Sequence, residues 1–281
     1  MIKIVSDSTS DLDKDQADKY GITIVPLNVY FGDDCYKDWV TLKPEEFYRL
    51  LKTNKHHPKT SQPSPEDFKK TFQQILDNGD EVLSIHMTSK MSGTYQSALI
   101  AKNDLGSEKV HVFDSGFCSI SLGLITIICS EAIQKGKSIL EMIGLLEKIK
   151  KELRLYFVVD TLEYLQKGGR IGKASALIGS LLNIKPILAL TDGAVEPFEK
   201  VRGSKKALGR LAELLDTFVN NHPRDKLAIS VGYSETEENM QEFLKLFPAD
   251  HPVHNAYKFS IGAVVGTHTG PGVVGISFIS L

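Results

Sequence analysis

Short apolar runs and longer amphipathic segments alternate through residues 1–153 of the chain. Four of the apolar runs have the length and composition of buried strands: residues 2–5, 22–25, 82–85 and 110–113. Apolar residues at helical spacing fill much of the remaining sequence, at residues 44–51, 64–79, 120–133 and 138–152. This repeated order of strands and helices predicts a parallel sheet covered by helices, which is a three-layer α/β domain.

Several helices carry capping signals at their starts. Ser64 precedes a proline and two acidic residues, which is a strong helix N-terminus. Ser138 is followed three positions later by Glu141, as in a capping box. In the same way Ser10, with Asp13 three positions later, predicts a first helix that ends at a glycine.

The second half of the chain has a different pattern. Strands are expected at residues 156–159, 186–190, 195–201, 227–232, 254–259 and 273–279. Helices are expected at residues 174–182, 204–220 and 235–246. The sequence Thr191-Asp192-Gly193-Ala194 predicts an antiparallel hairpin between two of the strands. We therefore expect an α+β domain at residues 154–281, following an α/β domain at residues 1–153.

Composition excludes several classes of protein. The 281 residues are 42% hydrophobic, and 33 basic residues nearly balance 35 acidic ones, giving a formal charge of −2. This balance gives no global attraction to nucleic acid or to an anionic membrane. The most apolar stretch, residues 118–129, is shorter than a membrane span of roughly 20 residues. With no signal-peptide pattern at the N-terminus, we expect a cytoplasmic protein.

The three cysteines give no sign of a metal or disulfide site. Cys35, Cys118 and Cys129 are far apart, and no CxxC pair is present. We expect buried structural thiols.

Three loops rich in hydroxyl groups and glycine are the candidate functional segments. They are residues 60–64, 92–97 and 266–272. Hydroxyls and free backbone amides hold a small anion by hydrogen bonds, and Ser92-Gly93-Thr94 also opens a predicted helix, whose N-terminus favours an anion. The loops contain no strong nucleophile, metal-ligand cluster or acid/base pair. They therefore favour a binding protein over an enzyme.

Residues 266–272 are the most constrained of these segments. Three glycines and one proline in seven residues imply a specific backbone path, which we expect to be a loop. His268 stands between two threonines in this loop and is a functional candidate.

An enzymatic alternative rests on Asp7. Residues 7–11 resemble the aspartate nucleophile loop of haloacid dehalogenase phosphatases, but Thr9 occupies the position of the required second aspartate. The resemblance is therefore weak, and a strand-end turn whose side chains bond the local backbone is the favoured interpretation of the segment. Residues 167–173 are glycine-rich and basic without forming a P-loop, so Arg170 is a candidate for contact with an anion or a partner. A phosphotransferase or hydrolase using Asp7 and the glycine-rich loops, or a sugar- or nucleotide-sensing module, stays open.

Taken in order along the chain, five segments resemble the DegV family of fatty acid-binding proteins. They are residues 6–12, 60–64, 92–98, 160–172 and 266–272, and the resemblance spans nearly the whole length. It implies two α/β domains with a long-chain fatty acid such as palmitate in a buried apolar tunnel. It further implies that the protein is not itself an enzyme and needs no cofactor.

The resemblance also assigns roles to particular residues. It implies that the carboxylate is held by Thr60, Ser61, Ser92, Thr94, His268 and Thr269. Arg170 and Arg202 match basic positions that contact a phosphate or a partner. The implied partner is a separate fatty acid kinase, whose acyl phosphate product feeds phospholipid synthesis; contact with a membrane would at most be transient.

Overall fold

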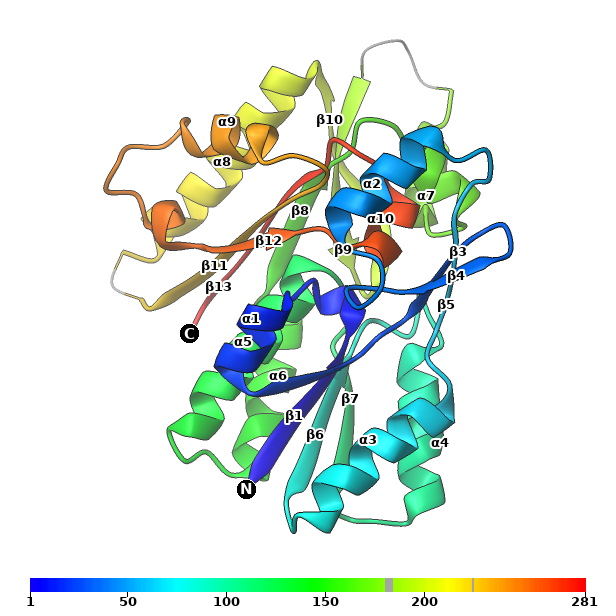
Figure 1. The fold of residues 1–281 in the computed structure, drawn as a ribbon. Coiled ribbons are helices and arrows are strands. Elements are labelled where there is room, and N and C mark those ends of the chain that lie inside the picture. The colour runs from blue at the N-terminus through cyan, green and yellow to red at the C-terminus, as the bar shows by residue number, and fades with distance from the viewer. Residues whose placement is uncertain (180–183, 224) are drawn as a thin grey trace.

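The N-terminal half is built on a four-stranded parallel sheet (Figure 1). The structure is a computed structural model and describes residues 1–179, 184–223 and 225–281. The strand order is β2-β1-β6-β7, and all three pairings are parallel. The strands are β1 (Ile2–Asp7), β2 (Ile22–Val25), β6 (Glu81–His86) and β7 (Val110–Asp114). They coincide with the four predicted apolar runs.

Helices cover both faces of this sheet, as predicted. On one face, α3 (Pro65–Asp77) and α4 (Thr94–Leu105) pack on strand residues such as Val5 and Val82. On the other face, the alternate strand residues Ile4 and Leu83 pack with α1 (Lys14–Tyr20), α5 (Ile120–Gln134) and α6 (Ile139–Glu152). The alternation of side chains along each strand produces this three-layer arrangement.

The helix caps read from the sequence are confirmed at α3 and α6 and wrong at α1. Capping boxes form at Ser64 and at Ser138. Residues Ser8–Ser10 instead make a short 3-10 turn, and α1 is capped by Asp13 with Gln16. The reason is that Asp11 adopts a left-handed conformation with φ 54°, which separates the two turns.

A small antiparallel sheet between these elements was not predicted. It has the order β4-β3-β5 and consists of β3 (Asn28–Phe31), β4 (Asp34–Lys37) and β5 (Lys59–Ser61), with α2 (Pro44–Thr53) inserted before β5. Its strands are short and partly polar, so they lack the apolar run that marks a buried strand. The sheet matters because β5 carries Thr60 and Ser61.

The C-terminal half contains a six-stranded mixed sheet with the order β10-β9-β8-β13-β11-β12. Its strands are β8 (Arg154–Val158), β9 (Ile184–Thr191), β10 (Ala194–Arg202), β11 (Leu227–Tyr233), β12 (Tyr257–Ser260) and β13 (Val274–Ser280). The predicted hairpin is confirmed: β9 and β10 pair antiparallel around Asp192 and Gly193, both at positive φ. Helices α8 (Ser204–Asn221) and α9 (Glu238–Leu244) pack on one face of this sheet.

Some expectations for this half need correction. The helix expected at 174–182 is a 3-10 helix over Gly172–Leu177, and positions 180–182 lie outside the described residues. The strand expected at 254–259 begins only at Tyr257, after a 3-10 turn at Pro252–Asn255. A short helix, α7 (Glu163–Lys167), was not predicted. The expected loop at 266–272 overlaps the helix α10 (Ala263–Thr269).

Helix α5 packs on both large sheets. It contacts β1 and β6 of the parallel sheet and β11 and β13 of the mixed sheet. Eleven of its residues, from Ile120 to Ser130, are buried without interruption. A helix that is apolar on all sides is expected to be surrounded by protein, which explains its sequence. The division into domains at residue 154 stays a prediction, since this helix joins the two sheets in one apolar core.

Candidate ligand-binding site

A cavity of about 420 Å³ lies between the two halves of the fold. Thr9 follows β1 and Met87 follows β6, so the cavity meets the parallel sheet at the carboxyl ends of its strands, where ligands bind in such folds. Its opposite wall is one face of the mixed sheet. The apolar wall residues include Leu27, Ile120, Leu155, Phe157, Leu190, Val195, Val264 and Val273.

Polar side chains gather on one part of the cavity wall, which we call the polar cluster. Its members are Thr60, Ser61, Gln62, Ser92, Arg170 and His268. Gln62 is exposed and the other five are partly exposed, whereas Ile120, Leu155 and Phe157 are buried. The polar cluster therefore lies toward solvent, and the apolar wall lies toward the interior.

His268 stands in the last turn of α10 and connects to β5. Its Nε2 lies 2.9 Å from the Thr60 hydroxyl oxygen, while the buried Nδ1 has no hydrogen-bond partner among the described residues. Burial, the nearby Arg170 cation and His57 lower the pKa of His268 to about 4. The ring is therefore neutral at pH 7 and adds no charge to the polar cluster.

Ser61 and Ser92 are held by neighbouring polar groups. The Ser61 hydroxyl oxygen accepts a hydrogen bond from the Asn28 amide at 3.0 Å and lies 3.2 Å from the Tyr30 hydroxyl. The Ser92 hydroxyl oxygen accepts from the Thr94 backbone amide at 3.3 Å and lies 2.9 Å from the Thr94 hydroxyl. Both serines line the cavity with their positions fixed from behind.

Arg170 is tied to the backbone on two sides. Its Nε donates to the carbonyl of Met91 at 3.0 Å, and one terminal nitrogen donates to the carbonyl of Gly168 at 2.6 Å. Within the described part of the chain it forms no ion pair with a carboxylate, so its charge is available to an anion. Gly168 has to be small here, because a Cβ at this position would lie 2.1 Å from Nδ1 of His268.

Six of the eight residues predicted for the site line the cavity, and two do not. The six are Thr60, Ser61, Ser92, Arg170, His268 and Thr269. Thr94 is fully buried behind Ser92, to which it hydrogen-bonds. Arg202, the last residue of β10, is exposed and lies off the cavity wall. The Thr269 hydroxyl donates to the carbonyl of Val265, one turn earlier in α10.

Gln62 and Gly93 are wall residues to which the sequence assigned no role. The Gln62 amide nitrogen donates to the Ser97 hydroxyl at 2.9 Å, which holds the side chain against the start of α4. A Cβ on Gly93 would lie 2.2 Å from the Gln62 amide oxygen. The close approach of Gln62 explains why residue 93 is a glycine, and this contact is visible only in the structure.

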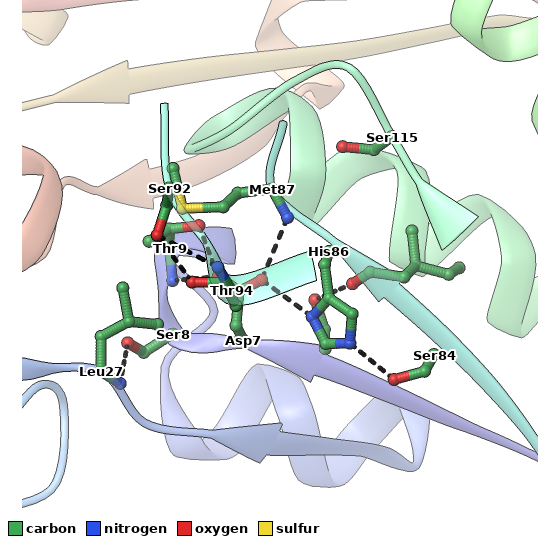
Figure 2. A network of polar contacts seen from close by, with 12 residues as sticks. Asp7, Ser8, Thr9, Leu27, Ser84, His86, Met87, Ser92, Thr94 and Ser115 are labelled. Carbon is green, nitrogen blue, oxygen red and sulfur yellow. Dashed lines mark hydrogen bonds and ion pairs between the residues drawn. The ribbon is translucent and has the colours of Figure 1, made fainter. Parts of the chain in front are cut away.

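Asp7 anchors a buried network next to the cavity (Figure 2). One carboxylate oxygen accepts the backbone amide of Thr9 at 3.1 Å and its hydroxyl at 2.5 Å. The other accepts the backbone amide of Met87 at 3.0 Å and Nδ1 of His86 at 3.0 Å. The network therefore fixes two wall residues, Thr9 and Met87, through one carboxylate.

The same network contains a serine, a histidine and an aspartate in sequence of contact. Ser84 Oγ lies 2.6 Å from Nε2 of His86, whose Nδ1 faces Asp7 (Figure 2). All three side chains are fully buried, and none of them lines the cavity. This arrangement has the connectivity of a hydrolase triad without access to a substrate. Asp7 is equally unsuited as a nucleophile, because each of its two carboxylate oxygens already accepts two hydrogen bonds.

Two other kinds of catalytic group would be a bound metal ion and a reactive cysteine. No cluster of three or more His, Cys, Asp or Glu side chains that could hold a metal ion occurs in the described parts of the chain. Cys118 lines the cavity, but burial, with the Asp11 and Asp7 carboxylates, raises the pKa of its thiol to about 12. The thiol is therefore protonated at neutral pH and is a poor nucleophile.

A mostly apolar cavity closed by a few converging polar groups is typical of a site for a small amphipathic molecule. The family model described as an uncharacterised protein of the DegV family matches residues 1–281, and the chain belongs to this family. A DegV domain-containing protein of Deinococcus radiodurans is 39% identical over 276 residues, covering 98% of this chain and 97% of the relative.

Two solved structures of relatives are similar over the whole chain. A fatty acid-binding DegV family protein from Thermus thermophilus has a TM-score of 0.91 and 36% identity, covering 100% of this chain and 99% of that one. A stearic acid-binding protein from Eubacterium ventriosum has a TM-score of 0.89 and 30% identity, covering 100% and 98%. No helix within residues 1–179, 184–223 and 225–281 is long and apolar enough to cross a membrane.

Proposed function

We propose that this protein binds a long-chain fatty acid in the cavity, with the hydrocarbon chain against the apolar wall and the carboxylate at the polar cluster. The observation that carries the proposal is the cavity itself, with its polar cluster toward solvent and its apolar wall in the interior. The fatty acid-binding relatives from Thermus thermophilus and Eubacterium ventriosum support the same ligand class.

Hydrocarbon burial is large enough to dominate the affinity. A 16-carbon chain such as palmitate has about fourteen methylenes, and at roughly 0.8 kcal/mol each they contribute about 11 kcal/mol before the costs of association. The polar cluster then has only to orient the head group. The cavity volume of about 420 Å³ falls in the range of roughly 300–1,000 Å³ seen for small-molecule sites.

The polar cluster would bind the carboxylate mainly with neutral donors. Thr60, Ser61 and Ser92 supply hydroxyls, and His268 is uncharged at pH 7. Arg170 already donates two of its N–H groups to backbone carbonyls, and its charge is available to the phosphate. A carboxylate bound in this way keeps the electron density that it needs to attack a phosphorus atom. Thr94 would act by fixing Ser92, and Thr269 would shape the wall beside His268.

The partner would be a separate fatty acid kinase. In that reaction a carboxylate oxygen attacks the γ-phosphorus of ATP, ADP leaves, and an acyl phosphate destined for phospholipid synthesis stays on this protein. The position of the polar cluster near solvent suits access by a second protein, with Arg170 near the transferred phosphate and the exposed Arg202 contacting the partner. We further propose that the protein is cytoplasmic and that residues 1–153 and 154–281 are its two domains.

Reconstitution with a fatty acid kinase, ATP and palmitate tests this function. Acyl phosphate should form only when this protein is present and loaded with the lipid. Turnover of ATP or of a phosphate ester by this protein alone would contradict the proposal and favour the hydrolase alternative. Equal phosphorylation of free palmitate by the kinase would refute the presenting role.

A further inference from the structure

One position on the apolar wall has no side chain. Gly275 lies in the buried strand β13, between Val274 and Ile276, whose side chains pack on the opposite face with α8 and α9. Since side chains alternate along a strand, a side chain at 275 would point to the face that carries α5 and the cavity. Phe157 of β8 and Gly232 of β11 are its partners in the sheet.

The space next to Gly275 would accept a methyl group. A Cβ at this position would lie 3.4 Å from Cδ1 of Ile120 and 3.4 Å from Cβ of Phe157, which are ordinary van der Waals distances. Ile120 and Phe157 are themselves wall residues. A side chain at 275 would therefore occupy volume between them that is now part of the cavity.

Gly232, which pairs with Gly275, shows the contrasting case. A Cβ on Gly232 would lie only 2.3 Å from Cγ2 of Ile120. Ile120 therefore already fills the hollow above one glycine and leaves the hollow above the other to the cavity. The two adjacent glycines look equivalent in the sheet, but only the one at 275 is on the cavity wall.

We propose that Gly275 is a specificity-determining position, whose missing side chain sets how long an acyl chain the cavity accepts. The inference rests on the proposed function, because it concerns the same cavity and ligand class. The polar cluster fixes one end of the ligand near solvent, so volume lost at the buried wall is lost to the far methylenes of the chain.

The size of the effect follows from the value of a buried methylene. Roughly 0.8 kcal/mol per methylene corresponds to about a fourfold change in affinity. Gly275→Ala should weaken the longest chains by about fourfold relative to the shortest. Gly275→Val, which adds three carbons, should shift the preferred chain length downward further.

Ile120→Val provides the reciprocal change. It removes the methyl group that lies 3.4 Å from the new Cβ, so the single variant should favour longer chains. The double variant Gly275→Ala/Ile120→Val should recover the wild-type preference, because one carbon is added and one is removed at the same place. Gly144→Ala is the matched control, since it is an exposed glycine on α6 with nothing within 4 Å of its Cβ position.

The experiment measures binding of saturated fatty acids from laurate to arachidate to delipidated wild-type protein, the variants and the control. A selective loss of long chains in Gly275→Ala, with recovery in the double variant, is the expected result. An unchanged chain-length profile in Gly275→Ala and in Ile120→Val would overturn the inference while leaving the proposed function intact. Absence of any fatty acid binding by the wild type would refute the proposed function itself. If Gly275→Ala does not fold, the Ile120→Val profile decides.

Discussion

Asp38 makes the stability of the folded protein depend on pH. It is buried, and one of its carboxylate oxygens accepts the backbone amide of Ala263 in the first turn of α10 at 3.0 Å. The other oxygen has no hydrogen-bond partner among the described residues. Burial raises the pKa of Asp38 to about 7 from its ordinary value of 3.8.

The folded and unfolded states bind different numbers of protons, and this decides whether the free energy of unfolding rises or falls with pH. Between pH 4 and 7 the folded protein keeps the Asp38 proton and the unfolded chain has lost it, so the free energy of unfolding falls as the pH rises. A separation of about three pKa units, at roughly 1.4 kcal/mol each, amounts to about 4 kcal/mol. This contribution is complete below pH 4 and is lost by pH 7. The neighbouring carboxyl of Asp11, whose pKa burial also raises, acts in the same direction.

Asp38→Asn should remove this component while keeping an oxygen acceptor for the Ala263 amide. Urea unfolding of wild type and variant at a series of pH values measures the difference between their stabilities. The variant should gain relative to wild type by up to about 4 kcal/mol between pH 4 and 7. Asp33→Asn, at an exposed loop position, is the matched control for replacing one aspartate by asparagine. A stability difference for Asp38→Asn that does not change with pH would show that Asp38 does not keep its proton in the folded protein.

Three further predictions concern the polar cluster. Ser92→Ala should lower kinase-dependent phosphorylation by about tenfold or more, from the loss of a hydrogen bond to a charged group worth roughly 1.5–3 kcal/mol, and should affect lipid retention less; equal losses in the two assays would count against this. Burial and the Arg170 cation lower the pKa of His268 to about 4. The contribution of His268 to the free energy of unfolding is therefore complete above pH 6.5 and declines as the pH falls toward 4. His268→Gln should abolish that part of the pH profile of urea unfolding, and an unaltered profile would show that the imidazole is not held neutral. Gly93→Ala should displace the Gln62 side chain, whose oxygen lies 2.2 Å from the new Cβ position, and reduce fatty acid affinity in a displacement assay. Unchanged affinity would show that Gln62 does not contribute to binding the fatty acid.

Local signals in the sequence were sufficient for much of the fold. Apolar runs in the sequence predict the parallel strands. The caps at Ser64 and Ser138 depend only on residues three positions away. The hairpin at Asp192-Gly193 is similar, since its turn chemistry is contained in two residues. Such features are decided within one turn or one strand of the chain.

Helix α10 shows what sequence could not provide. Its glycine and two threonines have low helix propensity, and a loop was expected there. The helix starts where Asp11 accepts the Gly262 amide at 2.8 Å and Asp38 accepts the Ala263 amide at 3.0 Å. These carboxylates are more than two hundred residues away in sequence, so no local pattern could reveal them.

The candidate site shows the same limit. Thr60, Ser92, Arg170 and His268 come from four separate segments, and residue types alone did not place them on one wall. The order of motifs shared with the DegV family singled them out, and the structure brings them together at the cavity. The structure also separates Arg202 from them, since Arg202 is exposed at the end of β10. The residues around Arg202 in the sequence do not reveal this exposure.

Denaturing mass spectrometry of ligand extracted from the purified recombinant protein shows directly whether the cavity holds a fatty acid. We expect a long-chain fatty acid in near-stoichiometric amount, bound non-covalently and displaced by added palmitate. Recovery of a nucleotide or a sugar in its place, or of no ligand from a protein that also fails to bind added palmitate, would contradict this expectation.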